Sequence, residues 1–168
     1  PAEAVTLADN LLARNPAADV RRRAQVMLAH GLFETNAFER AEAAYKDAIA
    51  NGVHLVTPTQ RHVHPNVLSS KIKHRNRLHM WIGDQQAKLA DPKAVGLYLD
   101  LDGNITETGG ANFVIYKRGM IHSPQRNNIL WGVSLETLRR LSGGMGIGFI
   151  ERDLQLHDVI NAEEAWLC

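Results

Sequence analysis

From residue 94 onward the hydrophobic pattern repeats with a period of two, and this feature limits the possible folds most strongly. The segments AVGLYLDLDG, NITE, NFVIYKRG and MIHS have the composition of strands, and Asp102-Gly103 and Arg118-Gly119 are turn signals between them. Short turns of this kind join antiparallel neighbours. We therefore predict a run of mostly antiparallel strands in the second half of the chain.

Glu107 interrupts this pattern. It stands between two threonines and is followed by Gly109 and Gly110, although glycine weakens the interior of a strand. One interpretation is a solvated carboxylate at a strand edge. The other is an inward carboxylate, beside a backbone without side chains, that faces a bound ring.

The other segments are predicted from periodicity and from helix-ending residues. We expect helices at 4–14, 34–52, 74–90 and 134–146, strands at 19–28, 53–58 and 147–154, and an extended segment at 61–70. Asn15-Pro16 and Gly52 are predicted to end the first two helices. Ser134 is the expected N-cap of the last helix, with Gly143-Gly144 beyond its end. Helices followed by mostly antiparallel strands indicate an α+β fold, with a domain boundary near residues 51–58.

Composition argues against a disordered chain and against a coiled coil. Hydrophobic residues make up 45% of the 168 residues and charged residues 22%, which is typical of a folded soluble domain. The net charge of +1 gives little support for nucleic-acid or membrane binding, although the basic clusters at 21–23 and 71–77 leave a nucleic-acid binder as an open hypothesis. A single cysteine, Cys168, favours a reducing compartment.

The segment KIKHRNR places five cationic side chains in seven positions, including Lys71 and Lys73. Crowded positive charge with partial burial favours a neutral amine, which can form a Schiff base with a carbonyl compound. The alternative is a basic surface at the start of a helix.

The segment NNILWGVSLETL places a glycine before a predicted helix. Free N–H groups at Gly132, Val133 and Ser134 would converge on an anion there. The alternative is an ordinary helix start. His62-x-His64 has no third ligand at a suitable spacing, so we predict no metal site.

A Schiff-base lysine, a strand carboxylate and a phosphate-binding helix start together describe a site for pyridoxal phosphate. The chain resembles the fold-type IV pyridoxal-phosphate enzymes, which are the class IV aminotransferases. These include branched-chain and D-amino-acid aminotransferases and 4-amino-4-deoxychorismate lyase. The resemblance lies in IKHRNRL, in LDLDGNITETGGANFVIYKRGMIHSP and in NNILWGVSLETL.

The resemblance implies a role for each matching residue. Lys73 would be the Schiff-base lysine, with Lys71 as a nearby alternative, and Glu107 would face the pyridine nitrogen. The separation of these two, 107 − 73 = 34 positions, lies within the family's range. The implied cofactor-binding residues are Lys73, Glu107, Asn112, Leu130, Gly132, Val133 and Ser134.

The resemblance also implies an architecture. Residues 1–52 would be the C-terminal part of a small α/β domain, and residues 53–168 most of a large cofactor-binding domain. We expect the chain to be truncated at both ends and catalytically incomplete alone, because the family's phosphate-binding arginine and a further Thr or Ser ligand would lie outside it.

The implied activity is transfer of an amino group between a small, branched-chain or D-amino acid and a 2-keto acid. The alternatives are a lyase of the aminodeoxychorismate type and a binding module that has lost the chemistry. We expect a cytoplasmic homodimer that acts on small molecules and binds neither nucleic acid nor membrane.

Overall fold

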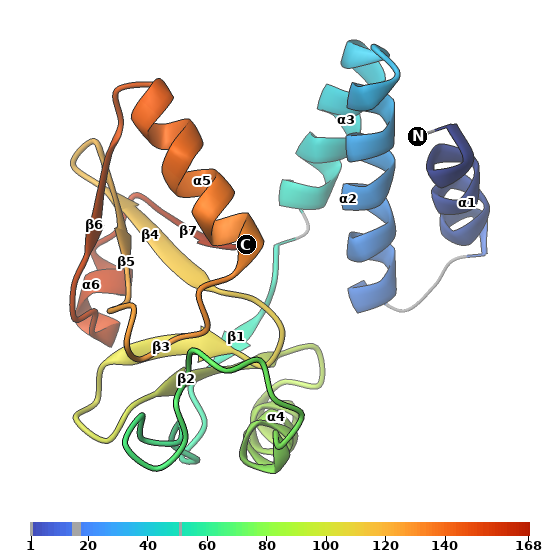
Figure 1. The fold of residues 1–168 in the computed structure, drawn as a ribbon. Helices are drawn as coiled ribbons and strands as arrows, with labels where there is room; N and C mark the ends of the chain where they lie inside the picture. Colours follow the sequence, from blue (N-terminus) through green and yellow to red (C-terminus); the bar gives the residue numbers. More distant parts are fainter. Residues whose placement is uncertain (1, 15–17, 51) are drawn as a thin grey trace. The chain divides into compact units, whose positions relative to one another are not determined.

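The computed structural model describes residues 2–14, 18–50 and 52–168. The chain divides into two compact units, Pro1–Val53 and His54–Cys168. In the described residues, the first unit is helical and the second contains the strands (Figure 1). The assignment of these units to the end of a small domain and most of a large domain stays a prediction.

The first unit consists of α1 (Ala2–Ala13), α2 (Ala18–Glu34) and α3 (Phe38–Ala50). α2 packs against both α1 and α3. The predicted end of the first helix at Asn15-Pro16 lies outside the described residues. Gly52 follows α3 with a φ of 51°, a left-handed conformation that glycine adopts without a Cβ clash.

The strand predicted at 19–28 is wrong, because these residues belong to α2. Ala24, Ala29 and Leu32 are all buried, and their spacing places them on one side of a helix. Arg, Ala, Gln, Met and Leu, which make up most of this segment, are good helix formers. Because the segment shows no clear alternation of hydrophobic and polar residues, helix propensity predicts its structure better than periodicity does.

The first sheet of the second unit has the order β1-β2-β3, formed by Leu55–Val56, Val95–Leu99 and Ile105–Thr108. β1 pairs parallel with β2, and β3 pairs antiparallel with β2. α4 (Leu78–Ala90) packs against β2. The helix predicted at 74–90 begins later than expected, at Leu78. Residues 61–70, which we expected to be extended, form loops and turns.

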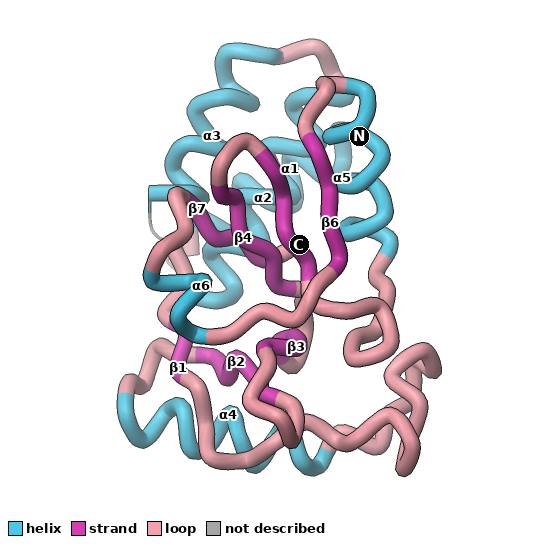
Figure 2. The backbone as a smooth tube through the Cα atoms, turned by 90° about the vertical axis from the view of Figure 1, so that its left-hand side faces the viewer, coloured by secondary structure: helices cyan, strands magenta, loops and turns pink. Residues whose placement is uncertain are grey.

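The second sheet has the order β6-β5-β4-β7 (Figure 2). Its strands are β4 (Phe113–Lys117), β5 (Met120–Ser123), β6 (Gly148–Glu151) and β7 (Glu164–Leu167). Positive φ angles at Arg118 and Gly119 form the tight turn between β4 and β5. The β5–β6 pair is parallel and the other pairs of this sheet are antiparallel. The α+β fold with mostly antiparallel strands is confirmed.

β4 contributes to two hydrophobic clusters because its side chains alternate between the faces of the sheet. Phe113 and Ile115 join β2 and β3, and α6 (Leu156–Ile160) lies beside this cluster through Val159. Val114 packs on the other face with Leu135 of α5 (Val133–Gly144). In this way β4 connects the two sheets and α5 through buried apolar contacts.

The ends of α5 differ from the prediction. Gly132 is the N-cap, without a capping side chain, and Ser134 lies inside the first turn. Gly143 and Gly144 form the last turn instead of following it. Gly146, with a φ of 71°, is the left-handed residue after the helix.

Within the described part of the chain, no helix has both the length and the apolar character needed to cross a membrane.

Gly83 explains how α4 approaches β2. A Cβ atom at Gly83 would lie 2.4 Å from the Tyr98 ring, which is too close for any real contact. In full-length protein, we expect Gly83→Ala to lower the free energy of unfolding by about 1–3 kcal/mol, because overpacking outweighs the gain in helix propensity. Urea unfolding measures the change.

Gly143→Ala is the matched control, since this helical glycine has open space around its Cβ position. We expect it to stabilise the protein by about 0.5–1 kcal/mol. Stabilisation by both substitutions would contradict the packing of α4 against Tyr98.

Candidate functional site

Glu107 is a buried carboxylate in β3. All four residues of this strand are buried, and Glu107 is only 6% exposed. Its Oε1 accepts a hydrogen bond from the Leu130 N–H (3.2 Å), and its Oε2 accepts one from Asn112 Nδ2 (3.1 Å). The interpretation of Glu107 as a solvated strand-edge residue is wrong, and the carboxylate has hydrogen-bond partners that compensate its burial.

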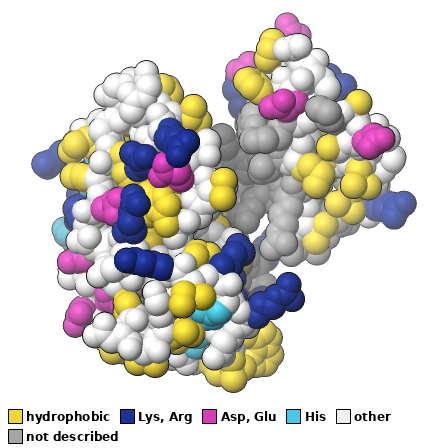
Figure 3. All heavy atoms as spheres, in the orientation of Figure 1, with side chains coloured by type: hydrophobic (Ala, Val, Ile, Leu, Met, Phe, Trp, Pro, Cys, Tyr) yellow, Lys and Arg dark blue, Asp and Glu magenta, His cyan; other side chains and the backbone are white. Residues whose placement is uncertain are grey.

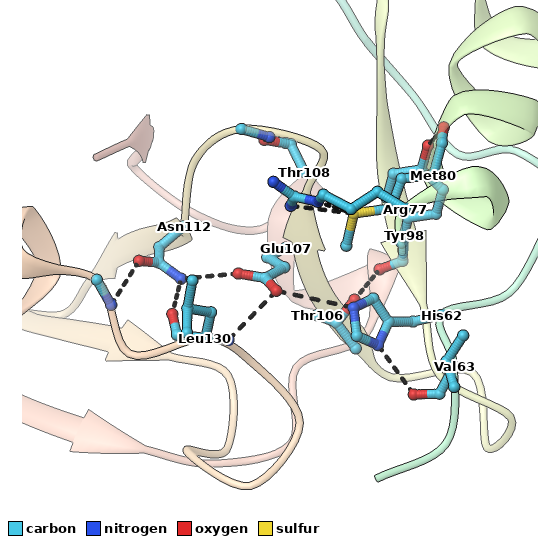
Figure 4. A network of polar contacts seen from close by, with 12 residues as sticks. His62, Val63, Arg77, Met80, Tyr98, Thr106, Glu107, Thr108, Asn112 and Leu130 are labelled. Atoms are coloured by element: carbon cyan, nitrogen blue, oxygen red, sulfur yellow. Dashed lines mark hydrogen bonds and ion pairs between the residues drawn. The ribbon is translucent and has the colours of Figure 1, made fainter. Parts of the chain in front are cut away.

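Asn112 links this carboxylate to the start of α5 (Figure 4). Its Nδ2 also donates to the Leu130 carbonyl (2.7 Å), and its Oδ1 accepts from the Gly132 N–H (3.2 Å). A Cβ at Gly132 would lie 2.4 Å from this Oδ1, so a larger residue there would displace the Asn112 side chain. The Gly132 N–H, which we expected to be free for an anion, therefore binds Asn112.

Lys73 and Glu107 line the same pocket, although 34 positions separate them. Lys73 is exposed and lies on the loop before α4. The cavity has a volume of about 30 Å³, and Leu130 belongs to its wall. The other lining residues are His62, Val63, Leu68, Ser70, Ile72, His74, Arg77, His79 and Met80.

Lys71 lies elsewhere. It lines a different hollow together with Arg126, Asn128 and Asp153. The two candidate lysines therefore line different hollows, and Lys73 shares its pocket with Glu107.

Val133 and Ser134 are exposed at the start of α5, and they are not among the residues that line the Glu107 pocket. Hydrogen bonds from Gly132 to Asn112 and from Asn112 to Glu107 connect the start of α5 to the carboxylate. Trp131 Nε1 donates to Glu136 Oε2 (3.0 Å), which ties the approach of the chain to the first turn of α5.

Glu136 is itself bound by cations. Hydrogen bonds from Arg139, then from Arg140 and Trp131, hold the pKa of its carboxyl well below the ordinary value. Figure 3 shows basic and acidic side chains interspersed on this face of the second unit, in keeping with ion pairs such as Arg126–Glu151. Arg22 and Arg23, in the other basic cluster, lie outside the described side chains.

The Glu107 pocket is rich in cationic and polar groups. Burial lowers the pKa of His79, and the neighbouring His62, His74 and Arg77 lower it further. Ser70 Oγ, His74 Nδ1 and His79 Nε2 are buried without a hydrogen-bond partner among the described residues. Such atoms can pair with the polar groups of a ligand, and a lysine amine beside a buried carboxylate fits a cofactor that carries an aldehyde and a ring nitrogen.

Sequence reasoning did not place His62 beside Glu107. We considered it only as a weak metal ligand, and no group of three metal-binding side chains is found among the described residues. In the structure its Nε2 lies 3.7 Å from Glu107 Oε1. No sequence signal indicated this contact, because 45 positions separate the residues (107 − 62).

The model of the class IV amino-transferase family matches residues 3–168, so the chain belongs to this family. Branched-chain-amino-acid aminotransferase-like protein 1 of Arabidopsis thaliana is 31% identical over 115 residues, which are 68% of this chain and 20% of that protein. The chain thus spans about a fifth of this relative's length.

Two solved structures show the same fold. The 4-amino-4-deoxychorismate lyase of Pseudomonas aeruginosa has a TM-score of 0.62 and 26% identity, over 71% of this chain and 44% of that one. The branched-chain aminotransferase of the archaeon Thermoproteus uzoniensis, solved with norvaline, has a TM-score of 0.66 and 24% identity, over 70% of this chain and 40% of that one.

Replacement of Asn112 tests the bridge between Glu107 and α5. We expect Asn112→Ala to lower the free energy of unfolding of the full-length protein by about 1–3 kcal/mol, because it leaves buried hydrogen-bonding groups unpaired. Urea unfolding is the measurement. Asn127→Ala, at an exposed asparagine, should stay within about 0.5 kcal/mol of the unsubstituted protein. Equal effects of the two substitutions would argue against the bridge.

His79 should make stability depend on pH. Its folded pKa lies below the ordinary value of 6.5. As the pH falls through that value, the unfolded chain takes up a proton that the folded pocket resists, so stability decreases. We expect His79→Gln to lose less stability between about pH 7 and 5 than the unsubstituted protein does, as measured by urea unfolding at each pH.

His64→Gln, outside the pocket, serves as the control for this measurement and should keep the original slope. An unchanged slope in His79→Gln would contradict the resisted protonation of His79.

Proposed function

We propose that the full-length protein is a pyridoxal-phosphate-dependent aminotransferase. It would move an amino group between a small amino acid, branched-chain or D-, and a 2-keto acid. The observation that carries this proposal is that Lys73 and Glu107 line one pocket, while Lys71 lines another. Membership of the class IV family supports it.

The residues proposed to hold the cofactor divide between the two ends of the site. Lys73 would bind it as a Schiff base, and Glu107 would accept a hydrogen bond from the ring nitrogen. Leu130 would lie against the ring, and the N–H groups of Val133 and Ser134 would face the phosphate at the start of α5. Asn112 and Gly132 would hold these two ends in register through their hydrogen bond.

Pyridoxal phosphate, when bound, supplies an electron sink for negative charge formed at the substrate Cα. The ionised Glu107 would keep the ring nitrogen protonated. The Lys73 amine, when free, would take the proton from the substrate Cα as a general base and deliver it to C4′ of the cofactor as a general acid. The hydrogen bonds from Asn112 and Leu130 keep the Glu107 carboxylate in place meanwhile.

A lyase of the aminodeoxychorismate type is the second candidate. The likeness to the Pseudomonas aeruginosa lyase and the Lys-x-x-Asn-Arg-Leu form of the segment 73–78 favour it. Pyruvate release from aminodeoxychorismate without an amino acceptor would decide for the lyase. Amino transfer to a 2-keto acid without that release would decide against it.

The remaining proposals concern the whole protein. We propose a cytoplasmic homodimer, with residues 1–52 at the end of the small domain and residues 53–168 forming most of the large one. The resemblance to the family supports the dimer, and the single cysteine supports the compartment.

Borohydride reduction tests the cofactor and the lysine together. Full-length protein is mixed with pyridoxal phosphate, reduced, digested and mapped by mass spectrometry. We expect a phosphopyridoxyl group on Lys73, which disappears in Lys73→Ala and persists in Lys71→Ala. An adduct on Lys71 would identify Lys71 as the Schiff-base lysine and would leave the proposed enzyme class unchanged. The absence of a specific adduct in folded protein would overturn the catalytic proposal and favour a binding module.

A further inference from the structure

His62 lies beside Glu107, opposite Asn112 (Figure 4). It is only 8% exposed, and its Nε2 is 3.7 Å from Glu107 Oε1. This distance is longer than a hydrogen bond but close enough for strong electrostatic coupling in a buried site. The Leu130 N–H binds the same oxygen at 3.2 Å, so Oε1 has two neighbours on this side.

The orientation of the His62 ring is set from several directions. Its Nδ1 lies 3.1 Å from the Val63 carbonyl, which can only accept, so Nδ1 carries a proton. The ring of His79 packs against it edge-on, with centroids 5.5 Å apart. The His62 backbone N–H donates to Leu99 of β2 (2.8 Å). Together these contacts direct Nε2 toward Glu107.

The charges around this pair come from three parts of the fold. Glu107 on β3 is the acidic side chain among the described residues that line the pocket. His79 on α4 is cationic when protonated. The loop before α4 adds three basic side chains, Lys73, His74 and Arg77. Glu107 therefore lies beside His62 within a largely basic lining.

We propose that His62 is a positioning residue that acts through Glu107. It holds the Oε1 side of the carboxylate, and it moderates the negative charge that Glu107 presents to a bound pyridine ring. This inference rests on the proposed function, because it concerns the same carboxylate and the same cofactor.

The test compares full-length protein with His62→Ala, His62→Gln and His64→Gln. His64 is a matched control: it lies two positions away, its Nδ1 accepts from the Asn66 N–H (3.2 Å), and it does not line the pocket. Three quantities are measured: the Kd for pyridoxal phosphate, the pH midpoint of the visible absorbance band of the bound cofactor, and kcat and KM separately.

We expect His62→Ala to raise the Kd for pyridoxal phosphate about tenfold, with His62→Gln between it and the unsubstituted protein. The pH midpoint should move in both variants, because Glu107 loses the imidazole that lies beside its Oε1. kcat should fall while KM changes little, because His62 acts through Glu107. His64→Gln should leave all three quantities unchanged.

Unchanged Kd and pH midpoint in both His62 variants would overturn the proposal, and so would equal shifts in His64→Gln. Should His62→Ala fail to fold, His62→Gln carries the test, because its amide keeps a polar group in the same place. Failure of the unsubstituted protein to bind pyridoxal phosphate would instead refute the proposed function, and this inference with it. The two failures are therefore distinguishable.

Discussion

The hydrogen-bonded burial of Glu107 is the constraint on which the rest of the site depends. A carboxylate loses much of its hydration in a buried strand, so the fold must supply donors around it. Asn112 and the Leu130 N–H are these donors, and both lie in segments that also position α5. Asn112 begins the bridge to α5, and Leu130 precedes that helix. The position of the carboxylate and the start of α5 are thus set by one network.

Packing explains why this network is held rigidly. Asn112 pairs through its backbone with Cys168, after the end of β7, and is followed by Phe113 and Val114 of β4, which enter different hydrophobic clusters. The polar bridge therefore lies directly beside the strand that connects both sheets and α5. A shift of Asn112 would disturb buried apolar contacts on both faces of β4, at a cost well above that of one hydrogen bond.

The pocket side of Glu107 has a different character. Lys73 stands on a loop, which gives its amine more freedom than a residue in a helix or strand has. His62 is buried and His79 is half-buried, their rings are in contact, and His62 brings an imidazole close to the carboxylate. Under the proposed function, Glu107 would hold the ring nitrogen in place while the Lys73 amine moves the proton.

The sequence alone determined the strand-rich second half, its turns and the residue types of the site, because hydrophobic period and turn chemistry are local properties. The sequence did not show that residues 19–28 are helical, because their hydrophobic pattern has no clear period. It also did not locate the start of α5, where Gly132 and not Ser134 is the N-cap. Only the tertiary structure decided that Lys73 shares a pocket with Glu107 and that His62 lies against that carboxylate. These contacts join segments distant in sequence, and such proximity depends on how the sheets and loops pack.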